Sequence, residues 1–414
     1  MTLDSNITFD AEYDLSPDNP YYGKVNFTNG VIINKTLKIN GDAFTINGNN
    51  ASRIFNINSD NCVLNNINFI NGRNPGYGAA VYSTALNTNI TNCNFTDNIG
   101  CDYGGAIYFE KIAYVSYSNF KSNQVEKNKV TRASGGAIYF KNEGKLFNTN
   151  FEDNTALYNG GAVYFASQAT LENCNFTRNN AVSGGAAYFA SQANIITSNF
   201  NANYARSSGA AYFSSTANVT NSNFSNNYAT NDNGGACSFN QQANVINCTF
   251  MNNTAKLGHG GAVHFEKNSI VENCNFTQNS ADTRGGAVNF AIDGTIINSN
   301  FLNNTGSTGG AAYIKGITNI IDCNFMNNTA RQKTGAVLIG SSGTVKKSYF
   351  TNNKAKGASA IEAKDSVEIS NSTFLNNKAD STALILTKIA KAVNITFEGN
   401  DNLLKVSFHK YVIH

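Results

Sequence analysis

Tyrosine recurs at one position of a repeated Gly-Gly-Ala-Ile/Val-Tyr-Phe stretch, and this position is where binding chemistry is expected. Each tyrosine lies between two core-type residues, so in a strand it would point outward and form an aromatic ladder with its equivalents. Tyrosine offers rigid, amphipathic contact area that suits a glycan or a protein. Stacked tyrosines also stabilise strands without any ligand, which leaves a structural role as the alternative. The row comprises Tyr82, Tyr108, Tyr139, Tyr164, Tyr188 and Tyr212.

The tyrosine row is interrupted at Ser238, and His264 and Asn289 follow before Tyr313 restores it. A ligand-binding face would therefore lie in the N-terminal half of the chain. The same half contains an insertion, residues 124–134, that carries three basic side chains: Lys127, Lys129 and Arg132. We predict that the tyrosine row and this inserted loop together form the binding surface.

Catalysis on a polysaccharide would require several acidic side chains that converge across neighbouring repeats, and a lyase would add a nearby Lys or Arg. The position two residues after the recurring phenylalanine contains no such acidic stack. Asp153 and Arg178 there are a candidate surface ion pair, a type of contact that contributes little. We expect no catalytic residues, and a polysaccharide lyase or hydrolase is the alternative function. The row reads Asp97, Ser122, Asp153, Arg178, Ala202 and Asn226.

Histidine and cysteine were considered as metal ligands. The chain has 4 His, and His259 and His264 lie five residues apart. Because a metal site needs more ligands of matching geometry, we expect no metal and no cofactor, and we expect His264 at the surface. Five of the 8 Cys share a small-residue position with Ser and Thr, so buried free thiols are predicted. These are Cys93, Cys174, Cys248, Cys274 and Cys323, of which Cys248 and Cys274 fall in adjacent repeats.

The elements that position these residues follow from a recurring phenylalanine, which we call the anchor. Most steps between anchors are 24–26 residues, and the insertion accounts for one step of 31. A fixed period of this length indicates a repeat architecture, and each repeat contains three short stretches with strand periodicity. We predict an all-β fold: a right-handed, single-stranded parallel β-helix with three short strands per coil. The anchors are Phe69, Phe95, Phe120, Phe151, Phe176, Phe200, Phe224, Phe250, Phe276, Phe301, Phe325, Phe350, Phe374 and Phe397.

Asparagine and glycine mark the corners of the predicted coil. Asn often stands three residues before the anchor, as at Asn92 and Asn173, where a sharp bend needs a left-handed residue. A second Asn stands three residues after every anchor from Asn98 to Asn400, and stacked copies should form a hydrogen-bonded ladder. The glycine pair should turn the last corner.

The repeat also sets the domain organisation. We assign residues 1–60 to an N-terminal cap with the first irregular coils, 61–400 to the β-helix, and 401–414 to an incomplete last coil or a truncated C-terminus. A continuation of the chain or a partner would be expected to cover this end. Net charge is only +3 and no basic stripe occurs, so we expect no nucleic-acid partner. No run of about 18 apolar residues encodes a membrane span, and the first residues do not resemble a signal peptide.

The Gly-Gly-Ala-Ile/Val-Tyr-Phe stretch together with Phe-x-x-Asn resembles the repeat of chlamydial polymorphic outer-membrane proteins. It is closer to the repeat of adhesin-like proteins of methanogenic archaea, and residues 33–39 and 52–57 resemble the start of their pectate-lyase-like β-helix. In contrast to these families, the sequence leads us to expect no export signal, no recognisable anchor and no outer-membrane barrel of the kind that the chlamydial members have.

The resemblance covers about residues 30–400 and implies a cell-surface or extracellular location. It favours a non-catalytic adhesin-like protein that binds glycans or proteins of host or neighbouring cells. The alternatives are the glycan-active enzyme and a purely structural spacer.

Overall fold

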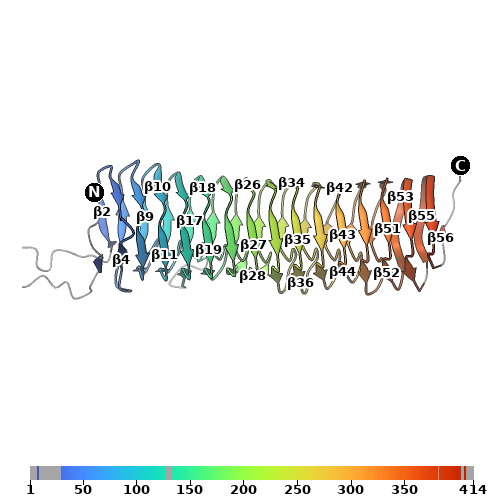
Figure 1. The fold of residues 1–414 in the computed structure, drawn as a ribbon, viewed down its shortest axis with the longest axis horizontal. Coiled ribbons are helices and arrows are strands. Elements are labelled where there is room, and N and C mark those ends of the chain that lie inside the picture. Colours follow the sequence, from blue (N-terminus) through green and yellow to red (C-terminus); the bar gives the residue numbers. More distant parts are fainter. Residues whose placement is uncertain (1–6, 9–28, 127–132, 381, 402–404, 407–414) are drawn as a thin grey trace, which may run out of the picture. The chain divides into compact units, whose positions relative to one another are not determined.

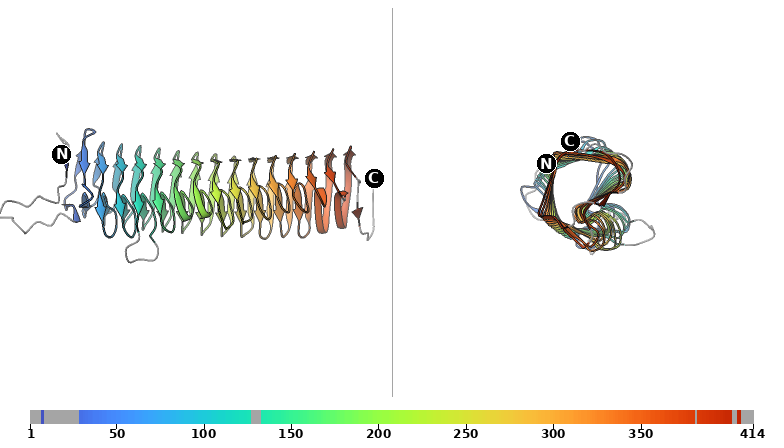
Figure 2. Two further views of the ribbon diagram at one scale, coloured as in Figure 1. Left: turned by 90° about the horizontal axis from the view of Figure 1, so that it is seen from below. Right: turned by 90° about the vertical axis from the view of Figure 1, so that its right-hand side faces the viewer.

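The computed structural model describes residues 7–8, 29–126, 133–380, 382–401 and 405–406. The chain divides into two compact units, Met1–Ala205 (unit 1) and Arg206–His414 (unit 2). Each unit is a right-handed parallel β-helix without an α-helix among its described residues. Within each unit, equivalent strands of successive coils lie side by side (Figure 1, Figure 2). Lys127, Lys129 and Arg132 of the predicted basic loop lie outside the described residues.

The first strand of each coil follows the glycine corner, and its residues pair in register with those of the next coil. In unit 1 the first strands are β2 (Val31–Ile33), β5 (Phe55–Ile57), β9 (Val81–Ser83), β13 (Ile107–Phe109), β17 (Ile138–Phe140), β21 (Val163–Phe165) and β25 (Ala187–Phe189). In unit 2 they are β29 (Ala211–Phe213), β33 (Cys237–Phe239), β37 (Val263–Phe265), β41 (Val288–Phe290), β45 (Ala312–Ile314) and β49 (Val337–Ile339).

The second strand of each coil carries the apolar residue five positions before the anchor. In unit 1 these strands are β3 (Lys38–Asn40), β6 (Val63–Asn65), β10 (Thr88–Thr91), β14 (Ala113–Ser116), β18 (Gly144–Phe147), β22 (Ala169–Glu172) and β26 (Ala193–Ile196). In unit 2 they are β30 (Ala217–Thr220), β34 (Ala243–Ile246), β38 (Ser269–Glu272), β42 (Gly294–Ile297), β46 (Thr318–Ile321) and β50 (Gly343–Lys346).

The third strand of each coil contains the anchor from β7 onward. In unit 1 these strands are β1 (Ile7–Thr8), β4 (Thr45–Asn47), β7 (Asn68–Ile70), β11 (Asn94–Thr96), β15 (Asn119–Lys121), β19 (Asn150–Glu152), β23 (Asn175–Thr177) and β27 (Asn199–Asn201). In unit 2 they are β31 (Asn223–Ser225), β35 (Thr249–Met251), β39 (Asn275–Thr277), β43 (Asn300–Leu302), β47 (Asn324–Met326) and β51 (Tyr349–Thr351).

In most coils a short fourth strand follows the three predicted strands. The sequence analysis did not anticipate it. In unit 1 it is β8 (Arg73–Asn74), β12 (Ile99–Gly100), β16 (Gln124–Val125), β20 (Thr155–Ala156) and β24 (Asn180–Ser183). In unit 2 it is β32 (Tyr228–Ala229), β36 (Thr254–Ala255), β40 (Ser280–Ala281), β44 (Thr305–Gly306), β48 (Thr329–Ala330), β52 (Lys354–Ala355) and β54 (Lys378–Ala379).

Strand β28 (Tyr204–Ser207), whose residues span the unit boundary, is a further short fourth strand. The last strands depart from this pattern, and β56 (Lys405–Val406) is the last described strand. In β53 (Ala358–Leu375) and β55 (Thr382–Glu398) the corners no longer interrupt the strand. The glycine pair is absent from this part of the sequence.

The core of each unit is a stack of the anchor phenylalanines. The rings of Phe95 and Phe120 lie 4.7 Å apart and nearly parallel, and those of Phe151 and Phe176 repeat this geometry. Buried phenylalanines of the first strand form a second stack, as for Phe140 and Phe165 at 4.8 Å. Identical side chains therefore repeat at the spacing of parallel strands, which fills the narrow interior and fixes the register of each coil.

Both predicted asparagine rows are confirmed at the corners. The Asn residues three before the anchor adopt left-handed φ, for example 53° at Asn92 and 54° at Asn173. The Asn residues three after the anchor are buried and linked in series. Asn154 illustrates the pattern: its Nδ2 donates to Asn179 Oδ1 (3.0 Å) and to the carbonyl of Phe120 (2.9 Å), and its Oδ1 accepts from Asn123.

Candidate functional site

The predicted tyrosine row of unit 1 forms one stacked ladder. Successive ring centroids lie 5.5 Å apart for Tyr82 and Tyr108, 5.2 Å for Tyr108 and Tyr139, 4.8 Å for Tyr139 and Tyr164, and 5.1 Å for Tyr164 and Tyr188. The in-register pairing of β9, β13, β17, β21 and β25 enforces this spacing. The predicted ladder geometry within unit 1 is therefore confirmed.

The sixth predicted tyrosine, Tyr212, belongs to unit 2. It is half-buried on β29, and its hydroxyl accepts a hydrogen bond from Asn240 Nδ2 at 2.7 Å. Tyr212 pairs in register with Ser238 of the next coil, where the tyrosines give way to smaller polar residues.

The predicted outward-facing tyrosines are largely covered. Tyr108 is only 6% exposed, and the other ladder tyrosines of unit 1 are half-buried. The loops that lead into the glycine pair lie over this face, and their residues form a row of single parallel bridges from Tyr77 through Tyr103 to Ser134. The sequence analysis treated these loops only as corners, so it did not anticipate a cover.

The covering loops contribute two further aromatic rings to the ladder. Tyr77 stacks on Tyr108 at 4.9 Å and on Tyr103 at 5.6 Å, and Tyr103 lies 4.7 Å from Tyr139. Tyr77 is 37% exposed and Tyr103 is half-exposed, so these two rings present the aromatic surface to solvent. We refer to Tyr77, Tyr82, Tyr103, Tyr108, Tyr139, Tyr164 and Tyr188 as the tyrosine cluster.

Charged groups border the tyrosine cluster at its first coils. The guanidinium of buried Arg53 lies 4.8 Å from the Tyr82 ring and donates to the backbone carbonyls of Tyr77 and Gly78. Burial lowers the pKa of Arg53 to about 10, so it remains charged at neutral pH. On the solvent side, Glu110 accepts from the hydroxyl of Tyr82 (3.4 Å) and pairs with Lys141.

The ladder phenols are held in their neutral form. Burial raises the pKa of Tyr82, Tyr108 and Tyr139 above the ordinary phenol value. Nearby Glu110 adds to the effect at Tyr82 and Tyr108, as does Tyr164 at Tyr139. A neutral phenol is both donor and acceptor of hydrogen bonds, so the cluster combines apolar rings with polar edges.

In unit 2 the corresponding row carries Ser238, His264 and Asn289 between Tyr212 and Tyr313. The expectation that His264 lies at the surface is wrong: His264 is 3% exposed, and the ring of His259 in the preceding loop lies 6.3 Å from its ring. Since a carboxylate only accepts, the Nε2–H of His264 donates to Glu266 at 2.9 Å. Its Nδ1 accepts from Asn289 Nδ2 at 2.8 Å, and the buried Oδ1 of Asn289 has no partner among the described residues. His259 in the covering loop contacts Thr283.

Acidification is expected to destabilise unit 2. Burial, together with the neighbouring His264 and Arg284, lowers the pKa of His259 below its ordinary value of 6.5. Below pH 6.5, His259 therefore binds a proton more readily in the unfolded chain than in the folded chain. The stability that is present above pH 6.5 is lost as the pH falls below this value. The hydrogen bond from His264 lowers the pKa of Glu266 as well, which adds a loss of stability below about pH 4.5.

The thermal midpoint of the full chain, measured from pH 8 to pH 4, should therefore begin to fall below pH 6.5. The variant His259→Asn should remove the part of the fall between pH 6.5 and 5. An unchanged profile in this variant would contradict the assignment to His259.

The remaining candidates have structural roles. Arg178 forms a two-point ion pair with Asp153, at 2.8 and 2.9 Å, on the exposed surface. The position two after the anchor is a corner with left-handed φ, as at Asp97 and Asp153, so its side chains project from a bend. Among the described residues, no group of three or more His, Cys, Asp and Glu could hold a metal ion.

The predicted free thiols are confirmed. All eight cysteines are free, and the five at the shared position are buried. The thiol of Cys93 donates to backbone carbonyls, and burial raises its pKa to about 12. Cys248 and Cys274 are neighbours: the backbone N–H of Cys248 contacts Cys274 Sγ at 3.4 Å. The five thiols at the shared position are buried within the core, where they act as small core residues.

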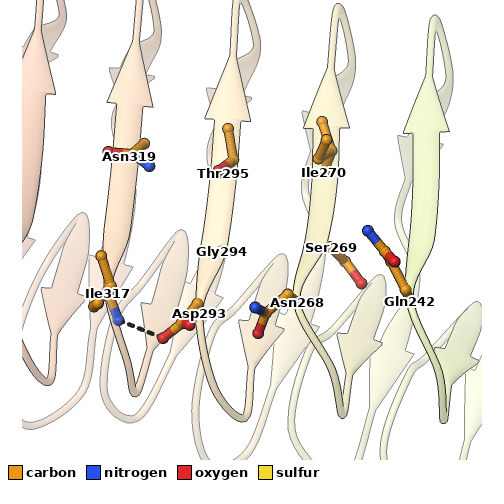
Figure 3. Close-up of a pocket in the computed structure, with 9 residues that line it drawn as sticks. All are labelled: Gln242, Asn268, Ser269, Ile270, Asp293, Gly294, Thr295, Ile317 and Asn319. Carbon is orange, nitrogen blue, oxygen red and sulfur yellow. Dashed lines mark hydrogen bonds between the residues drawn. The ribbon is translucent and has the colours of Figure 1, made fainter.

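A groove of about 320 Å³ lies on the outer side of β38, β42 and β46 in unit 2. Figure 3 shows Ile270, Thr295 and Asn319 in one row on the strands, with a second row contributed by the preceding turns. The second row comprises Gln242, Asn268, Asp293 and Ile317. The carboxylate of Asp293 accepts from the backbone N–H of Ile317 at 2.7 Å. No sequence motif indicated this groove.

Comparison with known proteins agrees with the fold. A model of the right-handed β-helix region matches residues 117–262, and a model of the Chlamydia polymorphic membrane protein repeat matches residues 92–110. The matched segments contain parts of the tyrosine row and of the anchor row. No curated protein sequence matches the chain. Among the described residues, no helix is long and apolar enough to cross a membrane.

Two solved structures align with the chain at low similarity. The periplasmic alginate epimerase AlgG aligns with a TM-score of 0.27 and 9% identity, over 88% of this chain and 77% of that chain. The PL6 family alginate lyase AlyGC aligns with a TM-score of 0.18 and 9% identity, over 94% of both chains. Similarity at this level carries no inference about activity, so function must be argued from the side chains.

Proposed function

We propose that this chain is a non-catalytic, adhesin-like surface protein that binds glycans or proteins of other cells. The observation that carries the proposal is the tyrosine cluster of unit 1, in which seven rings stack without interruption and Tyr77 and Tyr103 reach solvent. Tyrosine clusters of this kind provide contact area at low entropic cost. The matched polymorphic membrane protein repeat agrees with a location at the cell surface.

The coil architecture suits such a role because it holds the rings in place before a ligand arrives. In-register pairing and the loop bridges position the backbone on both sides of the cluster. A preformed aromatic surface loses little conformational freedom on binding, which favours affinity. The border of Arg53, Glu110 and Lys141 adds charge at one end, and the neutral phenols supply hydrogen bonds along the rest.

Replacement of the two accessible rings tests this proposal. The double variant Tyr77→Ser/Tyr103→Ser is expected to bind cells at least tenfold more weakly than the unmodified chain, since each aromatic anchor at an interface is worth about 1 kcal/mol or more. The measurement is binding of the purified full chain to a panel of fixed cells. Cells treated beforehand with protease or with periodate distinguish a protein ligand from a glycan.

The matched control is Tyr117→Ser, because Tyr117 is 54% exposed in the same unit but contacts Phe147 instead of the cluster. Equal binding by the double variant and the control would refute the role of the cluster. If the unmodified chain bound no cell type, the spacer hypothesis would replace adhesion. Release of soluble fragments from a polysaccharide panel would instead support the lyase or hydrolase alternative.

A further inference from the structure

The groove on unit 2 arises where a ladder of polar side chains is interrupted. On the outer side of the second strands, Asn244 Nδ2 donates to Asn218 Oδ1 at 2.9 Å, and Thr344 donates to Asn319 at 2.9 Å. Between these two hydrogen-bonded pairs, the residues at the equivalent positions of the ladder are Ile270 and Thr295. Neither side chain continues the ladder, so a gap remains at two successive coils and the groove occupies it.

The groove combines unengaged hydrogen-bonding groups with an apolar wall. Gln242 and Asn268 are exposed, and within the described part of the chain neither carboxamide has a hydrogen-bond partner. Thr295 adds a hydroxyl, while Ile270 and Ile317, the latter 52% exposed, provide aliphatic surface. These groups converge on one concave site whose backbone is fixed by the pairing of β38, β42 and β46.

The charge of the lining narrows the class of ligand. Asp293 is the single charged residue that lines the groove, and one of its oxygens already accepts from a backbone N–H. An anionic ligand would need Arg or Lys in the lining, and a hard divalent cation would need six or more oxygen ligands. Carboxamides and a hydroxyl donate and accept hydrogen bonds at once, which matches the vicinal hydroxyls of a sugar, and the isoleucines can cover its C–H face.

We propose that this groove is a binding site for a neutral oligosaccharide, with Gln242, Asn268 and Thr295 as the hydrogen-bonding residues and Ile270 and Ile317 as the apolar contacts. The site is separate from the tyrosine cluster, which lies in unit 1. Residues of four successive coils line it, so a saccharide chain would follow the stacking direction of the coils. The small volume and the open polar lining of the groove favour weak binding of the saccharide.

Saturation-transfer NMR on the full chain tests this site, with cello-, malto- and chito-oligosaccharides as neutral probes and oligogalacturonate as the anionic probe. At least one neutral probe should receive saturation, and its affinity should fall about threefold to tenfold in Asn268→Ala and in Thr295→Val, as the loss of one hydrogen bond predicts. Gln241→Ala is the matched control, because Gln241 is the exposed neighbour of Gln242 and does not line the groove.

Three results would overturn the assignment: no saturation of any neutral probe, equal affinity in Asn268→Ala and the control, or stronger binding of oligogalacturonate than of every neutral probe. The double variant Tyr77→Ser/Tyr103→Ser separates this inference from the proposed function. Retained saturation in that variant supports an independent groove. If the double variant loses saturation and Asn268→Ala keeps it, the saccharide binds at the tyrosine cluster and the groove is rejected.

Discussion

Replacement of Asn154 by alanine is expected to lower the free energy of unfolding by about 3–5 kcal/mol, since each buried polar group left without a partner costs about 1–3 kcal/mol. The change removes the acceptor of the Asn123 backbone N–H and side-chain amide. It also removes the donor to the Phe120 carbonyl, and the site is fully buried. Urea unfolding of the full chain measures the loss.

Asn150 is the matched control, because it lies in the same coil and also forms an asparagine ladder, with Asn119 and Asn175 at 2.8 Å. Its side chain is exposed, so water replaces the lost hydrogen bonds and Asn150→Ala should cost less than about 1 kcal/mol. Similar losses in the two variants would show that burial of the internal ladder does not govern the stability of the coils.

Replacement of Gly161 by alanine should destabilise the chain by about 3 kcal/mol or more, because overpacking against backbone cannot be relieved by a side-chain rotation. A Cβ at Gly161 would lie 2.0 Å from the carbonyl oxygen of Gly185 and 2.6 Å from the backbone of Asn180. The preceding Gly160 has a left-handed φ of 61°. The glycine pair thus combines a turn with a close approach between successive coils.

Gly76 provides the comparison for this prediction. A Cβ there would meet no atom closer than the side-chain oxygen of Asn74 at 3.4 Å, and the backbone has no left-handed φ. Gly76→Ala should therefore change the urea midpoint of the full chain little, within about 0.5 kcal/mol of stability. A Gly161→Ala variant as stable as Gly76→Ala would contradict the close approach of the coils.

Sequence reasoning predicted the fold well because the repeat constrains it many times over. The anchor phenylalanines, the two asparagine rows and the glycine pairs recur in coil after coil, and each keeps the same physical role. The register of Phe95 with Phe120, or of Asn98 with Asn123, follows directly from that recurrence. The short fourth strand was missed because its two residues, as in Thr155–Ala156, are too few to show a period.

The surface was predicted less well because loops carry no such period. The alternation of Val163, Tyr164 and Phe165 correctly placed the tyrosine outside the core. It could not reveal that the loop before the glycine pair folds over that face, since Tyr77 and Tyr103 have no tyrosine equivalents in later coils. His264 is buried as well, with the ring of His259 nearby. The groove depends on the breaks at Ile270 and Thr295, which are informative only once their neighbours are known.

The tyrosine cluster as a binding surface is the central claim, and tyrosine modification in the presence of bound cells tests it most directly. Limited iodination of the full chain, free and cell-bound, followed by mass spectrometry, reports the accessibility of each tyrosine. We predict that binding protects Tyr77 and Tyr103 at least severalfold and leaves Tyr117 unchanged. Equal modification of Tyr77 and Tyr103 in the free and bound chain would contradict the claim.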